Sequence, residues 1–129
     1  MDYSDVTLLG RIVKQPELLV TQSGKHYCEF IVAINKRTIW AGKVHHRVSY
    51  VDCTAWERIA ISVSERTAKG SRVFVKGPIE TSNYKRDDGS YHKKTWVTAV
   101  FFVALDEVEE AEGDGEREPR STLDDEFGG

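Results

Sequence analysis

The chain has 129 residues, 40% of them hydrophobic, with a net charge of −3 and two cysteines. This length suggests one domain that can bury a core. No apolar run is long enough to span a membrane, and the first residues lack the features of a secretory signal. Cys28 and Cys53 lie in apolar segments without metal-site spacing, which indicates buried thiols in a reducing compartment. We expect a cytoplasmic protein without a cofactor.

The small net charge hides two segments of opposite sign. Residues 1–105 contain 16 Lys and Arg and 10 Asp and Glu, a net charge of +6, whereas residues 106–129 contain 2 and 11, a net charge of −9. The segment 106–122 has no aromatic residue and little to bury, so we expect a disordered acidic tail at 106–129. A basic body with an acidic tail is typical of a polyanion-binding domain joined to an interaction tail.

The body is expected to consist of short strands and one helix. Alternating or apolar segments between turn residues predict strands at about 5–13, 18–21, 26–35, 48–54, 72–76, 79–84 and 95–105. Gly10 indicates a bulge or a close backbone approach within the first strand. The polar, basic segment 36–47 is expected to be a long loop with an exposed Trp40.

Residues 55–69 change to a helical period, since Ile59, Ala60 and Val63 share one face. Gly70 is expected directly after the helix, where a positive φ is wanted. This order predicts an all-β protein, a five-stranded antiparallel barrel of the oligonucleotide/oligosaccharide-binding (OB) type with one short helix between strands three and four. An SH3-like barrel or a β-sandwich would give a similar strand count, but the helix favours the OB type.

No catalytic motif is present. The four histidines have no Cys, Asp or Glu at metal-ligand spacing, and there is no nucleophile elbow, Walker loop or dinucleotide fingerprint. Asp87-Asp88-Gly89 lacks the downstream ligands of a calcium loop and is ordinary turn chemistry. We therefore expect neither an enzyme nor a metal site.

The segment 69–97 predicts a hairpin in which aromatic and basic side chains alternate. Tyr84, Tyr91 and Trp96 are interleaved with Lys and Arg residues. Aromatic faces among cations suit a surface that stacks nucleobases and follows a phosphate backbone. The alternative is a solvated hairpin with ordinary cross-strand aromatic pairs, and Trp56 and Trp96 could equally fill the core.

Several segments together resemble a known family. They are, in chain order, VTLLGRI (6–12), QPEL (15–18), FIVAINKR (30–37), KGSRVFVKG (69–77) and DGSY (88–91). In order and spacing they resemble the bacterial and phage single-stranded DNA-binding (SSB) proteins over about residues 5–105. The resemblance implies sequence-independent binding of single-stranded DNA during replication, recombination and repair. It also implies a homotetramer built from dimers, in the cytoplasm with the nucleoid.

The resemblance places the family's stacking aromatics on Tyr50, Trp56 and Tyr84. Its early loop tryptophan falls close to Thr38, and Trp40 shares a face with that position if the segment is extended. The expected stacking residues are therefore Trp40, Tyr50, Trp56 and Tyr84, and the expected phosphate-binding residues are Lys36, Arg37, Lys76, Lys85 and Arg86. Asp52 stands where a cation would be expected.

The family's tail ends in acids and a terminal Ile-Pro-Phe that docks onto replication and repair proteins. The matching tip here consists of Asp124, Asp125, Glu126 and Phe127. Ile-Pro is missing and Gly128-Gly129 follow, so we expect altered partner recruitment, with a plain solubilising tail as the alternative.

Two further functions remain open. One is an RNA-binding or primosomal accessory OB protein, which would exploit the 2′-hydroxyl if it reads RNA. The other is a protein-interaction module whose acidic tail is its working part and which has negligible affinity for nucleic acid.

Overall fold

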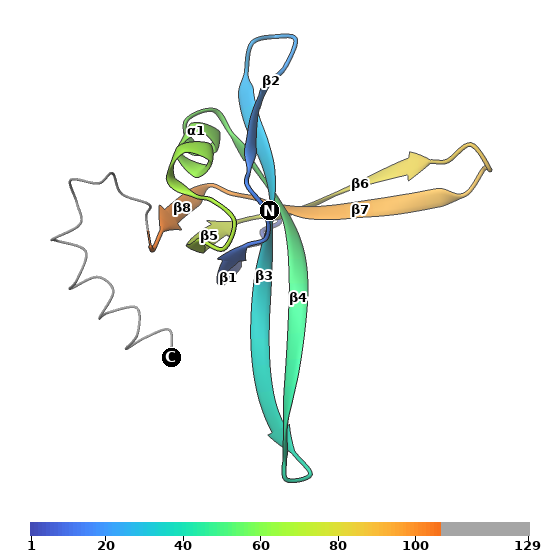
Figure 1. Cartoon of the computed structure of the whole chain (residues 1–129). Coiled ribbons are helices and arrows are strands. Elements are labelled where there is room, and N and C mark those ends of the chain that lie inside the picture. Colours follow the sequence, from blue (N-terminus) through green and yellow to red (C-terminus); the bar gives the residue numbers. More distant parts are fainter. Residues whose placement is uncertain (107–129) are drawn as a thin grey trace, which may run out of the picture.

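Eight strands and one helix make up the part of the chain that the computed structural model describes, residues 1–106 (Figure 1). The elements are β1 (Val6–Ile12), β2 (Glu17–Val20), β3 (His26–Trp40), β4 (Lys43–Trp56), α1 (Glu57–Arg66), β5 (Arg72–Gly77), β6 (Ile79–Lys85), β7 (Tyr91–Thr98) and β8 (Phe101–Ala104). The sheet order is β6-β7-β4-β3-β1-β5-β8, with β2 paired to β3. All pairs are antiparallel except β4–β7. Two hairpins, β3–β4 and β6–β7, project from the body in different directions (Figure 1).

The segment 36–47 is not the long loop that its polarity predicted. β3 and β4 stay paired along their whole length, from Tyr27 opposite Trp56 to Trp40 opposite Lys43. The turn consists of Ala41 and Gly42, which both have positive φ, the conformation that tight hairpins prefer. Because the outer part of this ribbon has no buried face, its sequence lacks the apolar alternation that would have indicated strands.

The apolar run 95–105 forms two strands rather than one. β7 pairs with β4, β8 pairs with β5, and the chain changes neighbour at Ala99 and Val100. The Ala99 N–H donates to the Thr54 carbonyl (2.8 Å) and the Val100 N–H to the Lys76 carbonyl (2.9 Å). The chain therefore passes from its place beside β4 to its place beside β5 at this short crossing. A mostly β fold with one short helix is confirmed, whereas the closed five-stranded barrel was wrong in strand number and closure.

The predicted helix is confirmed between β4 and β5, but its end differs. α1 buries Ala60 and Val63 against the sheet and ends at Arg66. The Thr67 hydroxyl donates to the Val63 carbonyl at 2.7 Å. Gly70 has a φ of +91°, yet it lies in the turn into β5 and not directly after the helix, so its predicted place was wrong.

The core lies between the inner face of the curved sheet and α1. Its buried side chains are Leu8, Ile12, Cys28, Phe30, Val32, Cys53, Ala55, Ala60, Val63, Val73, Val75, Val97 and Ala99. The two cysteines are free and buried, as predicted. Burial raises the pKa of the Cys28 thiol to about 11 and that of the Cys53 thiol to about 12. The helix within residues 1–106 is too short to cross a membrane.

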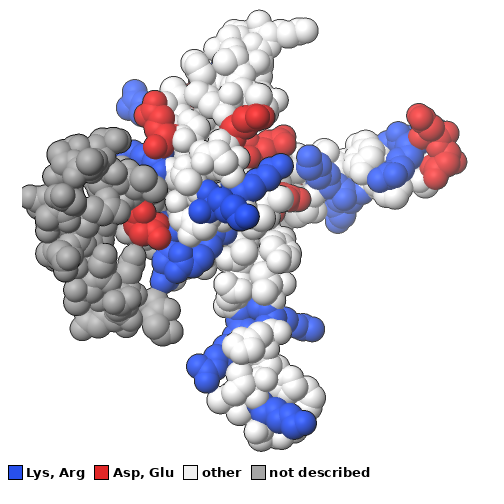
Figure 2. Space-filling model, viewed as in Figure 1, with Lys and Arg blue, Asp and Glu red and all other residues white. Residues whose placement is uncertain are grey.

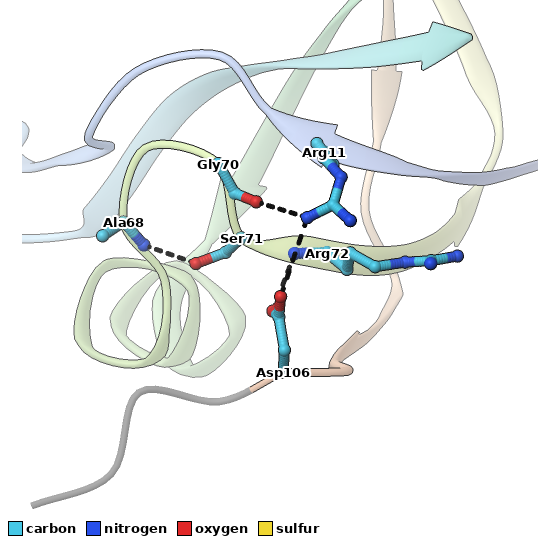
Figure 3. A network of polar contacts seen from close by, with 6 residues as sticks. All are labelled: Arg11, Ala68, Gly70, Ser71, Arg72 and Asp106. Carbon is cyan, nitrogen blue, oxygen red and sulfur yellow. Dashed lines mark hydrogen bonds and ion pairs between the residues drawn. The ribbon is translucent and has the colours of Figure 1, made fainter. Parts of the chain in front are cut away.

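Asp106 ties the end of β8 to the turn before β5 (Figure 3). Its carboxylate accepts a hydrogen bond from the Arg72 backbone N–H (2.8 Å) and lies 3.8 Å from the Arg11 guanidinium. Arg11 also donates to the Gly70 carbonyl at 2.9 Å. Asp106 is thus held by the body, while the rest of the acidic segment, with the predicted partner-binding tip at 124–127, lies outside the described residues.

Two glycines allow backbones to approach closely. A Cβ at Gly10 would overlap the Ala33 carbonyl oxygen, which confirms the predicted close approach in the first strand. A Cβ at Gly77 would overlap the Thr98 carbonyl oxygen, where β5 meets the end of β7.

We expect Gly77→Ala to lower the free energy of unfolding by about 1–3 kcal/mol or more, because the obstructing atom belongs to backbone that other strands hold in place. Urea unfolding followed by circular dichroism measures this change. Asn83→Ala, at an exposed position on β6, is the control and should leave the midpoint unchanged. An unchanged midpoint for Gly77→Ala would show that the two strands are not packed this closely.

Candidate nucleic-acid interface

A groove of about 800 Å³ lies between the β1–β2 connection and the root of the β6–β7 hairpin, across β3 and β4. Three aromatic side chains line it: Tyr27, Trp56 and Trp96. Tyr27 and Trp56 are opposite each other in the β3–β4 register and stack, with ring centroids 5.2 Å apart and an interplanar angle of 27°. Trp56 is 43% exposed, so the alternative that it fills the core is wrong.

The strand period explains why these side chains share a surface. Cys28 and Phe30 on β3 point into the core, so Tyr27 and its odd-numbered neighbours point to the opposite side. On β4, Cys53 and Ala55 point inward, so the even-numbered residues share the side of Tyr27. We call this side the groove face. By the same alternation, Arg37 and Tyr50 lie on its continuation along the β3–β4 hairpin.

The β6–β7 hairpin continues the groove face in another direction. Glu80 opposite Trp96 and Ser82 opposite Lys94 line the groove, so the next pair on this side is Tyr84 opposite His92. The Tyr84 and His92 rings stack with centroids 5.7 Å apart. The Arg86 guanidinium lies 6.0 Å from the Tyr84 ring centroid, within the range of a cation–π contact.

Four of the predicted site residues lie elsewhere. Lys36 and Trp40 are on the opposite face of the β3–β4 hairpin. Lys85 is on the opposite face of the β6–β7 hairpin, over the Tyr91 ring at 5.7 Å. Lys76 lies on β5, away from the groove, and forms an ion pair with the Asp5 carboxylate. The structure therefore brings Arg37, Tyr50, Trp56, Tyr84 and Arg86 to one surface and separates the other four from it.

The groove itself is not strongly basic. Its charged lining consists of Lys14 and Lys94 with four acids, Glu17, Glu29, Asp52 and Glu80. Asp52, the acid noted where the family resemblance suggested a cation, thus faces the groove. Within residues 1–106, no cluster of three or more His, Cys, Asp and Glu side chains could hold a metal ion. Aromatic surface, rather than positive charge, is what the groove offers a ligand.

Sequence reasoning missed Tyr27 and Lys14, left Trp96 undecided, and did not choose Lys94 among the hairpin cations as a phosphate contact. For Trp96 a signal was available, because Val97 is apolar and strand alternation sends its neighbour to the other side. Tyr27 could not have been placed, since its contact with Trp56 depends on the β3–β4 register, which the turn at residues 41–42 sets.

Together, the curved β sheet, the single helix and the aromatic groove define a small β domain of the OB-like class. The model of the single-strand binding protein family matches residues 3–105. The chain belongs to this family, which confirms the resemblance.

Several curated relatives are similar to this chain. The single-stranded DNA-binding protein of Bacillus cereus is 31% identical over 112 residues, which is 87% of this chain and 64% of the relative. Single-stranded DNA-binding protein A of Bacillus subtilis is 32% identical over 110 residues, 85% of this chain and 62% of the relative. The chain thus spans less than two thirds of the length of these relatives.

A solved structure shows the same fold. The Plasmodium falciparum SSB in complex with ssDNA superimposes with a TM-score of 0.74 at 17% sequence identity, covering 82% of this chain and 97% of that chain.

Proposed function

We propose that the groove face binds single-stranded DNA without sequence preference by stacking bases on aromatic side chains. The observation that carries this is the convergence of Tyr27, Trp56 and Trp96 in one groove, continued by Tyr50 and Tyr84 on two hairpins. Each base stack is worth about 1–3 kcal/mol, and every base offers a ring face, so stacking does not select a sequence. Membership of the single-strand binding protein family supports the same function.

The groove and the hairpins carry different charges, so they are proposed to contact different parts of the DNA strand. With four acids among its lining residues, the groove favours neutral base rings over phosphates. Arg37 and Arg86 extend the groove face beyond these acids and are the proposed phosphate contacts, together with Lys94. Lys76 and Lys85 are the weaker phosphate candidates, because each already contacts a side chain outside the groove.

The outer face of β1, β5 and β8 supports self-association. Leu9, Phe74 and Val103 are adjacent across these strands, and Phe101 packs edge to face on Phe74 with centroids 6.0 Å apart. Leu9 is 49% and Phe101 51% exposed. An apolar patch of this kind on a small domain marks an interaction surface, and the chain is proposed to form the homotetramer that the family resemblance implied.

The proposed wider role is protection of single strands during replication, recombination and repair, with recruitment of repair and replication proteins. Its support is the resemblance and the acidic tip with Phe127. A synthetic peptide of residues 120–129 that fails to compete with the full chain for a bound partner would leave the tail only a solubilising role.

Binding of oligo(dT) should quench the tryptophan fluorescence to saturation, with an affinity that falls as salt rises. Trp56→Ala should weaken binding roughly five- to 150-fold, because one base stack is lost. Tyr91→Ala, an exposed aromatic on the opposite face of β7, is the control and should bind normally. Absence of quenching at low salt would leave the protein-interaction module, and tighter binding of oligo(U) would favour the RNA-binding alternative.

Asp52→Asn should raise the affinity for oligo(dT) roughly two- to fivefold at low salt, because an exposed charge interaction contributes about 0.2–1 kcal/mol. The gain should disappear at high salt, where exposed charges are screened. Glu65→Gln, on the exposed side of α1, removes the same charge outside the groove and should have little effect. Equal affinities for the Asp52 variant and the unmodified chain at low salt would mean that phosphates do not pass near Asp52.

Leu9→Glu should reduce the assembled mass measured by light scattering, because it places a charge in the apolar outer face. Thr81→Glu, exposed on β6 and away from this face, is the matched control. An unchanged mass for the Leu9 variant would assign self-association to another surface.

A further inference from the structure

Glu57 stands where β4 ends and α1 begins, directly after Trp56. Trp56 is still extended, with a φ of −126° and a ψ of 150°. Glu57 has a φ of +52°, in the left-handed region that residues other than glycine rarely adopt. The chain therefore leaves the sheet within one residue, so that Trp56 stays in the groove while α1 packs Ala60 into the core.

A glutamate is an unfavourable choice for this backbone conformation. Its Cβ approaches the following carbonyl oxygen, whereas glycine would adopt the same φ without a steric cost. Within residues 1–106, Ala41 is the other non-glycine residue with a positive φ, and the tight turn of the β3–β4 hairpin explains it. At Glu57 the strain lies beside a groove residue, which points to a role for its side chain.

The Glu57 side chain reaches back to the start of β3. Its Oε1 atom accepts a hydrogen bond from the His26 backbone N–H at 3.2 Å and lies 4.0 Å from the His26 Nδ1 atom. In the β3–β4 register, His26 and Glu57 occupy the position next to Tyr27 and Trp56, the last pair of this ladder. A side chain therefore links the two strands one residue beyond the aromatic stack, where their backbone pairing ends.

The position of this link matters because the ends of paired strands open more readily than the middle. The Tyr27–Trp56 stack is at such an end. His26 and Glu57 are not among the residues that line the groove, so they act on a ligand only through the two aromatic rings. A ring that is already held in place binds a base at a lower ordering cost.

We propose that Glu57 is a positioning residue for DNA binding: its hydrogen bond to the His26 N–H holds Tyr27 and Trp56 stacked before a base arrives. This rests on the proposed function of the groove. The His26 and Glu57 side chains are 41% and 55% exposed, so water can replace the bond, and its net contribution to folding is small. Its loss is therefore expected to affect binding more than stability.

Three substitutions at Glu57 separate the side chain from the backbone strain, and all three remove the same charge. Glu57→Gln keeps an Oε1 acceptor and should bind oligo(dT) within twofold of the unmodified chain. Glu57→Ala and Glu57→Gly remove the acceptor and should weaken binding about three- to tenfold, the cost of ordering one large side chain. Glu57→Gly also relieves the strain, so its unfolding midpoint should exceed that of Glu57→Ala although both bind alike.

Near-ultraviolet circular dichroism of the free chain gives a readout that does not depend on DNA, since it reports fixed aromatic packing. The part of the signal that is lost in Trp56→Ala should decrease in Glu57→Ala and remain in Glu57→Gln. Two controls should keep both this signal and normal binding. His26→Ala retains the backbone N–H, and Glu65→Ala removes an exposed acid elsewhere on α1.

Binding that follows stability, with Glu57→Gly normal and Glu57→Ala weak, would overturn the inference and leave Glu57 a role in the fold alone. Weak binding by Glu57→Gln would also overturn it, because that variant retains the acceptor. If all three variants bind normally while Trp56→Ala binds weakly, the inference fails and the groove function stands. If the unmodified chain does not bind oligo(dT), the proposed function itself fails.

Discussion

The pairing of β3 with β4 is the constraint on which the rest of the structure depends. One register runs from Tyr27 opposite Trp56, beside the core, to Trp40 opposite Lys43 at the tip. Because successive side chains alternate, this register decides which residues fill the core and which face a ligand. A slip of one residue would exchange the two sets, burying Asp52 and exposing Cys53. Cys28 and Cys53 are buried, so their side of β3 and β4 must face the core. The side chains that alternate with them therefore form the groove face.

The groove face combines aromatic rings with acids, and this combination sets how it can bind. Four carboxylates among the lining residues oppose a phosphate backbone inside the groove, while Tyr27, Trp56 and Trp96 offer ring faces there. Both projecting hairpins carry Lys and Arg side chains beyond the groove, and the end of the β6–β7 hairpin also carries acids (Figure 2). In the proposed binding mode, this arrangement places bases inward and phosphates outward.

Much of the fold was predictable, because the local sequence patterns matched the elements that the structure contains. The helical period of Ala60 and Val63 and the apolar context of the two cysteines both gave correct predictions. The segment 36–47 could not be predicted, because a ribbon exposed on both sides has no apolar alternation. The division between β7 and β8 was also hidden, since the chain changes neighbour where carbonyls of Thr54 and Lys76, distant in sequence, accept its N–H groups. For the same reason, sequence reasoning could name Trp40 and Tyr50 as aromatic candidates but not assign them to opposite faces.

Single-stranded DNA is proposed to lie on the groove face of the sheet. Ultraviolet cross-linking of the full chain to oligo(dT), followed by mapping of the cross-linked peptides, tests this most directly. The structure predicts cross-links to Tyr27, Trp56 and Trp96, the aromatic lining of the groove. Cross-links confined to the outer face, at Phe74 and Phe101, would contradict it and would assign the nucleic acid to the surface proposed here for self-association.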